Sequence, residues 1–175
     1  MKRHSTSGAS ILTLIVLATG CAATTAMAPS SIDAQAHALA PPSDRALVYL
    51  YRSEAFGGAV KMSVLIDGVF SGETVPHAYM LWEVAPGRHV ITSKAENDEQ
   101  LELNAEPGRA YFVWQEVKMG LMMARSRLHL VPEPEGRGEL ANCRLIDMPP
   151  DARAFNAGRP VAFGGPTAQA TASSP

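Results

Sequence analysis

Hydrophobic and polar residues alternate with a period of two through the middle of the chain. Met62, Val64 and Ile66 share one face of residues 61–67. Two further segments alternate in the same way, and four others are rich in Val, Tyr, Trp and Phe, as in strands covered on both faces. These six segments are residues 46–52, 79–84, 89–95, 101–105, 109–118 and 127–130. The pattern predicts an all-β fold, a small antiparallel β-sandwich of about seven strands.

Turn-forming residues separate the predicted strands. Asp67-Gly68 is typical of a two-residue hairpin, because a type I′ turn needs positive φ at both central residues. Pro86-Gly87-Arg88 and Pro107-Gly108-Arg109 each precede a strand, where Pro fixes φ and Gly accepts a left-handed conformation. The turns therefore support the strand pattern.

The first twenty residues have the three parts of an export signal. Lys2 and Arg3 are basic, residues 11–18 are apolar, and small residues then lead into Cys21. The apolar stretch is much shorter than the roughly 20 residues that cross a bilayer as a helix. We therefore expect residues 1–20 to be a signal peptide.

The end of this signal resembles the bacterial lipobox. Leu17-Ala18-Thr19-Gly20 precedes Cys21, and a lipobox is cleaved directly before its cysteine. The resemblance implies a diacylglycerol on the Cys21 sulfur and a further acyl chain, such as palmitate, on its amino group. Two or three acyl chains anchor a protein stably where one does not. Ala18 stands where the commonest lipobox has Leu. The alternative is an ordinary secretory signal that is cleaved after Ala26 or Ala28.

Composition divides the mature chain into three parts. Residues 21–44 contain Ala, Ser, Thr and Pro with hardly any bulky side chain, which predicts a flexible tether behind the lipidated cysteine. Residues 45–146 contain the predicted strands and are numerous enough for one core. Residues 147–175 are rich in Pro, Ala and Gly and are expected to form a disordered tail.

The charge of the chain gives no support to nucleic-acid binding. The chain has 15 basic and 17 acidic residues. Removal of residues 1–20 takes away two basic residues, Lys2 and Arg3, and no acidic residue, so the mature chain has a net charge of −4. The sequence has no basic stripe that would neutralise phosphates. We therefore expect no nucleic-acid partner.

Cys21 and Cys143 are the two cysteines of the chain. With Cys21 lipidated, Cys143 has no partner for an intramolecular disulfide. Residues 135–145 predict a short C-terminal helix that places Cys143 and Leu140 on one face. We expect Cys143 to be a small buried apolar residue. A catalytic thiol, or a disulfide between two chains, is the alternative.

Residues 45–145 resemble the bacterial lipoprotein domain of unknown function DUF2846. The resemblance rests on residues 46–52, Ile66-Asp67-Gly68, the two Pro-Gly-Arg turns and residues 139–145. The middle segment, residues 67–89, is also similar to PEGA repeats, surface β-modules of the carboxypeptidase-regulatory type. Both resemblances imply a small β-sandwich, and neither supplies catalytic residues or a ligand.

Motifs for catalysis, metals or cofactors are absent from the sequence. His77, His89 and His129 lie far apart, without paired cysteines or a His-Glu-x-x-His helix, so no metal site is expected. A sandwich that brings His89 and His129 together is the alternative. No Gly-x-Ser-x-Gly elbow is present, and we expect no catalytic residue and no cofactor. The acidic residues Glu96, Asp98, Glu99 and Glu102 are expected to solvate a hairpin turn, although paired carboxylates in a cleft can act in acid–base catalysis.

The segment of residues 119–124 is apolar throughout, although loops between strands are normally polar. We expect this segment to fold over an open end of the sandwich as part of the core. The alternative is a Met-rich contact for a protein, lipid or peptide, formed by Leu121, Met122 and Met123.

The sequence as a whole predicts a membrane-anchored bacterial envelope lipoprotein whose non-catalytic β-sandwich has a binding or structural role. The expected partners are the lipid bilayer, through acylated Cys21, and an unidentified envelope protein or polymer. Many such lipoproteins are retained in the inner membrane by Asp after the cysteine; here Ala22 occupies that position, which favours the outer membrane, facing the periplasm. The alternative is an envelope hydrolase or thiol enzyme that uses Cys143, His89 or His129.

Overall fold

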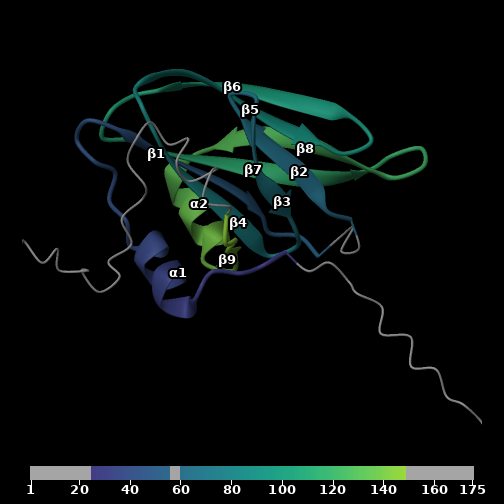
Figure 1. Ribbon diagram of the computed structural model, residues 1–175, viewed down its shortest axis with the longest axis horizontal. Coiled ribbons are helices and arrows are strands. Elements are labelled where there is room, and N and C mark those ends of the chain that lie inside the picture. Colours follow the sequence, from purple (N-terminus) through teal and green to yellow (C-terminus); the bar gives the residue numbers. More distant parts are fainter. Residues whose placement is uncertain (1–24, 56–59, 149–175) are drawn as a thin grey trace, which may run out of the picture.

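The computed structural model describes residues 25–55 and 60–148, which form two packed β-sheets and two short helices (Figure 1). The five-stranded sheet consists, in spatial order, of β8 (Ala124–Val131), β7 (Ala110–Met119), β1 (Ala46–Arg52), β4 (Ala78–Val84) and β9 (Arg144–Leu145). The four-stranded sheet consists of β3 (Val69–Thr74), β2 (Met62–Ile66), β5 (Gly87–Lys94) and β6 (Asp98–Ala105). The predicted all-β sandwich is confirmed.

Several predictions concern residues outside this range. The signal peptide, Cys21 and the tail after residue 148 lie outside the described residues. Within the described ranges, neither helix has the length and apolar character needed to cross a membrane.

Strand β1 is buried over its whole length because both of its faces are covered. Val48 and Leu50 point into the core between the sheets, where they meet Ile66 of β2. The alternate residues, among them Tyr49 and Tyr51, point to the opposite face and pack beneath the helices α1 (Ser30–His37) and α2 (Glu133–Leu140). The molecule therefore has three layers, with the five-stranded sheet in the middle.

The structure contains nine strands in the described residues, two more than the periodicity predicts. Strand β3 is the second arm of the hairpin at Asp67-Gly68, and its mixed composition hides it. Strand β9 has two residues, too few to show a period. Two pairings, β1 with β7 and β4 with β9, are parallel, whereas the other pairings are antiparallel. Parallel pairing of β1 with β7 is possible because the long intervening segment forms the second sheet and β4.

Helix α2 begins and ends earlier than the predicted residues 135–145. Pro134 lies in its first turn, where a missing N–H breaks no helical hydrogen bond, and Glu133 and Glu135 face the positive end of the helix dipole. Gly136 lies so close to strand β7 that a Cβ atom there would be 2.3 Å from Cβ of Phe112. Because α2 ends at Leu140, Cys143 follows the helix instead of lying on it.

Residues 26–39 pack against the sandwich, and we call them the strap. Met27 forms a bridge with Ile146 beside β9, and helix α1 covers the sheet with Ala36 fully buried. The prediction of a flexible tether over residues 21–44 is therefore wrong from Ala26 onward. Ala28 and Ala36 are the buried apolar residues of the strap and bring its backbone close to the sheet, whereas its bulkier residues Met27, Ile32 and Leu39 are only partly buried.

Candidate interaction site

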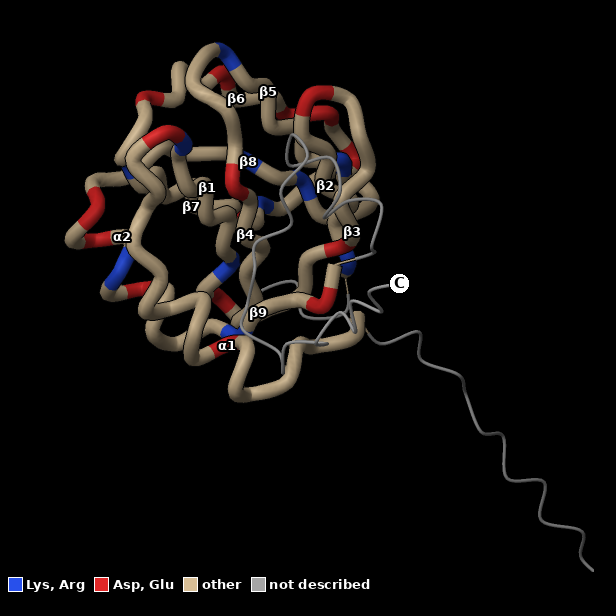
Figure 2. Tube along the Cα trace, turned by 60° about the vertical axis from the view of Figure 1, so that its left-hand side comes forward, with Lys and Arg blue, Asp and Glu red and all other residues tan. Residues whose placement is uncertain are grey.

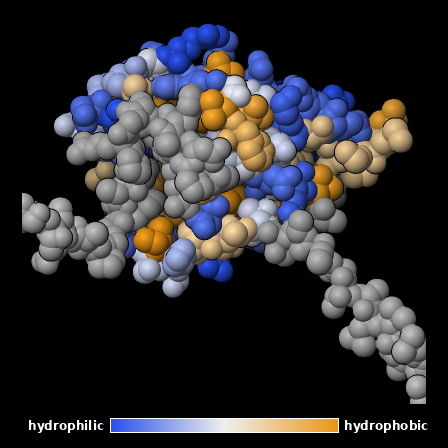
Figure 3. Space-filling model, viewed as in Figure 1, coloured by the Kyte–Doolittle hydropathy of each residue, from blue (hydrophilic) through white to orange (hydrophobic). Residues whose placement is uncertain are grey.

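The hairpin between β7 and β8 ends in an exposed apolar turn, residues 119–123, which we call the tip. Its four side chains are largely exposed, with Leu121 at 93%, Met122 at 90%, Met119 at 80% and Met123 at 62%. The hairpin extends beyond the body of the sandwich in Figure 1, and its end forms an apolar protrusion in Figure 3. The expectation that this segment forms part of the core is wrong.

The tip cannot fold back over the sandwich because the two strands remain paired up to its base. The register continues from Gln115 opposite Leu128 to Met119 opposite Ala124. Only the residues between Met119 and Ala124 are left for the turn, which is too short to reach the core. Pairing of the strands therefore outweighs burial of the apolar side chains.

Glu96, in the turn between β5 and β6, holds the backbone of the tip. Its carboxylate accepts hydrogen bonds from the backbone N–H groups of Leu121 at 3.0 Å, Met122 at 2.8 Å and Met123 at 2.8 Å. These three bonds, that of Met123 first, lower the pKa of Glu96 to about 2. Glu96 therefore stays ionised at neutral pH and fixes a turn whose side chains point outward.

Gly120 and Asn97 fix the tip further. A Cβ atom at Gly120 would lie 2.0 Å from the carbonyl oxygen of Met123 and 2.7 Å from Oε2 of Glu96, so this turn admits only glycine there. Asn97 donates to the carbonyl oxygen of Ser126 at 3.0 Å and accepts from its N–H at 2.9 Å. The β5–β6 turn is thus hydrogen-bonded to the β7–β8 hairpin both at the tip, through Glu96, and at Ser126 of β8, through Asn97. These bonds hold the backbone of the tip in one conformation before any partner binds.

Charged residues flank the tip without forming a patch of one sign. Lys118 and Arg125 lie opposite each other in the register, directly behind Met119 and Ala124. Lysine, arginine, aspartate and glutamate are interspersed over the rest of the trace (Figure 2). The distinctive feature of this end of the molecule is therefore its apolar character. Rigid backbone with adaptable thioether side chains suits a contact surface, because little backbone order is lost on binding.

Two other acidic residues of the β5–β6 hairpin, Asp98 and Glu102, take part in surface ion pairs. Asp98 accepts a hydrogen bond from Lys94 at 2.7 Å, and Glu102 pairs with Arg88 across the two strands. Such exposed pairs contribute little to stability. Of the four acidic residues singled out in the sequence, Glu96 is the one whose carboxylate is hydrogen-bonded to the backbone of the tip. No sequence motif indicates this role.

Cys143 is buried, as the sequence predicts, with 3% of its surface exposed. Its Sγ lies 3.8 Å from the carbonyl oxygen of Arg52 and 3.7 Å from that of Glu139. Burial, followed by the nearby charge of Glu139, raises the pKa of the thiol to about 12. The thiol therefore stays protonated at neutral pH, whereas a catalytic cysteine needs an accessible thiolate.

His89 stabilises the turn of the β2–β3 hairpin. Its Nδ1 lies 2.7 Å from Oδ2 of Asp67, and its Nε2 donates to the carbonyl oxygen of Ala85 at 2.8 Å. Asp67 also accepts the N–H of Val90 at 2.7 Å and has a positive φ of 49°. Both ring nitrogens are thus engaged in holding a turn.

His129 lies on β8 and pairs with a different carboxylate. Its Nε2 is 2.8 Å from Oε2 of Glu116, and its ring stacks on Trp114 with the centroids 5.1 Å apart. His89 and His129 therefore have separate partners. The described residues include no group of three or more His, Cys, Asp or Glu side chains placed to hold a metal ion.

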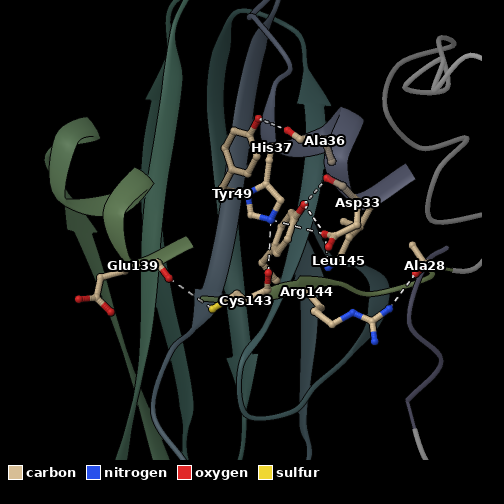
Figure 4. A network of polar contacts seen from close by, with 10 residues as sticks. Ala28, Asp33, Ala36, His37, Tyr49, Glu139, Cys143, Arg144 and Leu145 are labelled. Atoms are coloured by element: carbon tan, nitrogen blue, oxygen red, sulfur yellow. Dashed lines mark hydrogen bonds and ion pairs between the residues drawn. The ribbon is translucent and has the colours of Figure 1, made fainter. Parts of the chain in front are cut away.

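A polar cluster at the strap was missed in the sequence, where His37 falls in the expected tether (Figure 4). Oδ1 of Asp33 accepts hydrogen bonds from the hydroxyl of Tyr79 at 2.9 Å and from the N–H of Leu145 at 2.8 Å. Nε2 of His37 donates to the carbonyl oxygen of Cys143 at 3.3 Å, and the His37 ring meets that of Tyr79 edge-on. Burial raises the pKa of Tyr79, so its hydroxyl remains a donor. The spacing of Ile32 and Ala36, four residues apart on α1, is the signal that could have revealed a packed helix.

Fold and site together define a small β-sandwich domain that presents a preorganised apolar tip. Residues 42–126, which include the tip, match the family model of a protein of unknown function (DUF2846), in agreement with the resemblance seen in the sequence. A protein of Haemophilus influenzae described as uncharacterized is 26% identical over 138 residues, which cover 78% of this chain and 82% of the relative. No solved structure matches the chain at a significant level.

Proposed function

We propose that the protein is a bacterial envelope lipoprotein, held in a bilayer by acyl chains on Cys21, whose β-sandwich binds another envelope component through the tip. The observation that carries the proposal is the exposure of Leu121, Met122 and Met123 on a backbone fixed by Glu96. Contiguous exposed apolar side chains on a small domain mark interaction sites. The three hydrogen bonds keep apolar side chains exposed to water, which is unfavourable unless a partner covers them.

Binding is favoured over catalysis because the candidate catalytic groups are engaged in structure. The thiol of Cys143 is buried and has a pKa of about 12. Both ring nitrogens of His89 are hydrogen-bonded, and Nε2 of His129 is paired with Glu116. The resemblance of residues 67–89 to PEGA repeats is compatible with this proposal, since such repeats are surface β-modules. The partner that fits the tip is a protein with an apolar groove, into which Leu121 and Met122 insert.

The anchor is tested by replacing Cys21 with Ser. We expect radiolabelled fatty acid to enter the wild-type protein and not Cys21→Ser, and we expect that variant to leave the membrane fraction. Cys143→Ser is the matched control, since it also removes one thiol, and it should remain labelled and membrane-bound. Because Ala22 follows Cys21, the wild type should fractionate with the outer membrane on a density gradient. Unlabelled wild-type protein contradicts the anchor, and co-fractionation with the inner membrane contradicts the location.

The tip is tested by photocrosslinking in intact cells. A photoreactive amino acid at position 122 should give one discrete adduct, because Met122 is 90% exposed at the centre of the tip. Position 138 is the matched control, since Gly138 is exposed on α2 and a Cβ there meets nothing within 4 Å. An adduct from position 122 and not from position 138 supports the proposal. Identical adducts from both positions, or none from position 122, contradict it.

A further inference from the structure

The chain between Cys21 and the packed part of the protein is short. Thr25 is the first described residue, and the strap begins at Ala26. Three residues lie between Cys21 and Thr25, so the two Cα atoms are four steps apart along the chain and at most about 14 Å from each other. A free tether over residues 21–44 would instead reach about 80 Å. The packing of the strap therefore decides how far the domain can move from its anchor.

The strap is fixed at its beginning by backbone pairing. Asp147 donates its N–H to the carbonyl oxygen of Ala26 at 2.9 Å, and the N–H of Ala28 donates to Leu145 at 2.9 Å. Met27 bridges Ile146 in antiparallel register, so residues 26–28 extend the five-stranded sheet beyond β9. The first fixed residue thus lies directly after Thr25.

The strap is fixed again at helix α1 by buried contacts. Asp33 accepts the hydroxyl of Tyr79 and the N–H of Leu145. Figure 4 shows Asp33 beside Leu145. The hydroxyl of Tyr49 donates to the carbonyl oxygen of Ala36 at 3.0 Å, in a buried position. Separating the strap from the sheet would leave these polar groups without partners, so its bound position is strongly favoured.

Sheet order separates the strap from the tip hairpin. Residues 26–28 lie beyond β9 at one edge of the five-stranded sheet, and β8 forms the opposite edge. Five spacings between neighbouring strands separate the two edges, which amounts to about 24 Å. The lipid anchor and the tip hairpin therefore belong to opposite edges of the same sheet.

We propose that the edge formed by residues 26–28 and β9 faces the bilayer, with Ala26 at most about 17 Å from acylated Cys21. This inference rests on the proposed lipidation of Cys21. A domain of this size is about 35 Å across, so no part of it reaches more than about 50 Å from that bilayer. The partner of the tip is therefore a component that lies in or close to the same membrane as the anchor.

The test measures the height of two positions above a bilayer. Full-length lipidated protein is reconstituted into phosphatidylethanolamine–phosphatidylglycerol vesicles with an energy-transfer acceptor on the headgroups. A donor dye is attached to Ala26→Cys at the strap edge or to Arg127→Cys on β8, both exposed positions. The dye reacts selectively, because Cys143 is buried and the thiol of Cys21 is occupied by lipid. A matched variant carries a 20-residue Gly/Ser insertion after Ala22, which leaves the domain unchanged.

We expect stronger energy transfer from position 26 than from position 127, with a difference in height of up to about 24 Å. The insertion should raise position 26 by about 25 Å, the r.m.s. length of such a linker. Equal heights at the two positions, or an insertion that changes neither height, would overturn the inference. Wild-type protein that fails to float with the vesicles shows instead that the proposed anchor is wrong, before any height is measured.

Discussion

At the scale of single residues, Glu96 determines the shape of the tip. Its one carboxylate accepts the N–H groups of three consecutive residues, Leu121 to Met123, that have no strand partner. The side chain comes from the four-stranded sheet, whereas the tip belongs to the five-stranded sheet. Glu96 therefore joins the two sheets at the place where the apolar side chains are displayed.

Replacing Glu96 with Ala should loosen the tip without unfolding the sandwich. We expect faster amide hydrogen exchange at residues 121–123, because their N–H groups lose their acceptor. Exchange in β1 should remain unchanged. Glu99→Ala removes an acidic residue from the same hairpin and is the matched control. Protected amides at residues 121–123 in Glu96→Ala would contradict this role.

The same carboxylate gives the tip a pH dependence. The pKa of Glu96 is lowered from 4.5 to about 2, so the folded state favours the ionised form. Its contribution is therefore fully present above pH 4.5 and is lost as the pH falls toward 2. Amide exchange at residues 121–123, corrected for its intrinsic pH dependence, should rise over this window in the wild type and not in Glu96→Ala. A flat profile in the wild type contradicts the assignment.

Gln115 joins the two sheets inside the core. Its side-chain N–H₂ donates to the hydroxyl of Ser93 at 2.6 Å, and its carbonyl oxygen accepts the hydroxyl of Thr74 at 2.6 Å. Gln115, Ser93 and Thr74 are fully buried. A polar residue in the middle of β7 is thus tolerated because both ends of its amide are satisfied.

Gln115→Ala should lower the free energy of unfolding by about 2–4 kcal/mol, since it opens a cavity and leaves the buried hydroxyl of Ser93 without its donor. Thr74 loses its 2.6 Å bond and keeps the longer one, of 3.3 Å, to the carbonyl oxygen of Met62. Gln100→Ala, at an exposed position on β6, is the control and should change stability by no more than about 0.5 kcal/mol. Urea denaturation measures both values. Equal stabilities for the two variants would show that the buried amide contributes nothing.

At the scale of elements, the sequence shows best those strands that have one clear period. Residues 61–67 alternate because one face of β2 meets the core, and β2 was predicted within one residue of its bounds. The strap has no comparable signal, because Ala28 and Ala36 pack by being small instead of large. Parallel pairing and strand β9 depend on contacts far apart in the chain, which local periodicity does not report.

The tip shows a different reason for failure. Its composition was recognised from the sequence, and Leu121, Met122 and Met123 were identified as contact candidates. Whether they are buried or exposed depends on how far β7 and β8 remain paired and on Glu96, which lies 25 residues from Leu121 in the chain. Hydropathy alone predicts that these side chains are buried, whereas strand pairing and the hydrogen bonds of Glu96 keep them exposed.

Removal of the strap should destabilise the domain. A chain truncated to residues 40–148 leaves the hydroxyls of Tyr49 and Tyr79 and the N–H of Leu145 without their partners in the strap. We expect a loss of at least about 3 kcal/mol relative to residues 25–148, since the truncation removes three hydrogen bonds worth about 1 kcal/mol each, together with the apolar contacts of Ala28 and Ala36. Chemical denaturation of the two chains measures the difference. Equal stability would mean that the strap is not part of the folded unit.

At the scale of the whole molecule, one sheet connects the strap to the tip. The strap extends the five-stranded sheet at the edge of β9, and the tip hairpin begins at the other edge with β7 and β8. The sheet is covered on one face by the second sheet and on the other by α1 and α2, so it is rigid. This arrangement holds the tip at a defined distance from the strap, which follows the proposed lipid anchor in the chain.

The central claim is that the tip is a contact surface and not a part of the core. Its most direct test is one comparison of Met122→Ser/Met123→Ser with Met122→Leu/Met123→Leu, in which thermal stability and crosslinking in intact cells are both measured. We expect both variants to keep the wild-type stability within about 0.5 kcal/mol, because the side chains are 90% and 62% exposed. We expect Leu to preserve partner capture and Ser to abolish it. Destabilisation of the Ser variant by the ~2–5 kcal/mol typical of a core residue, or capture that survives it, would contradict the account.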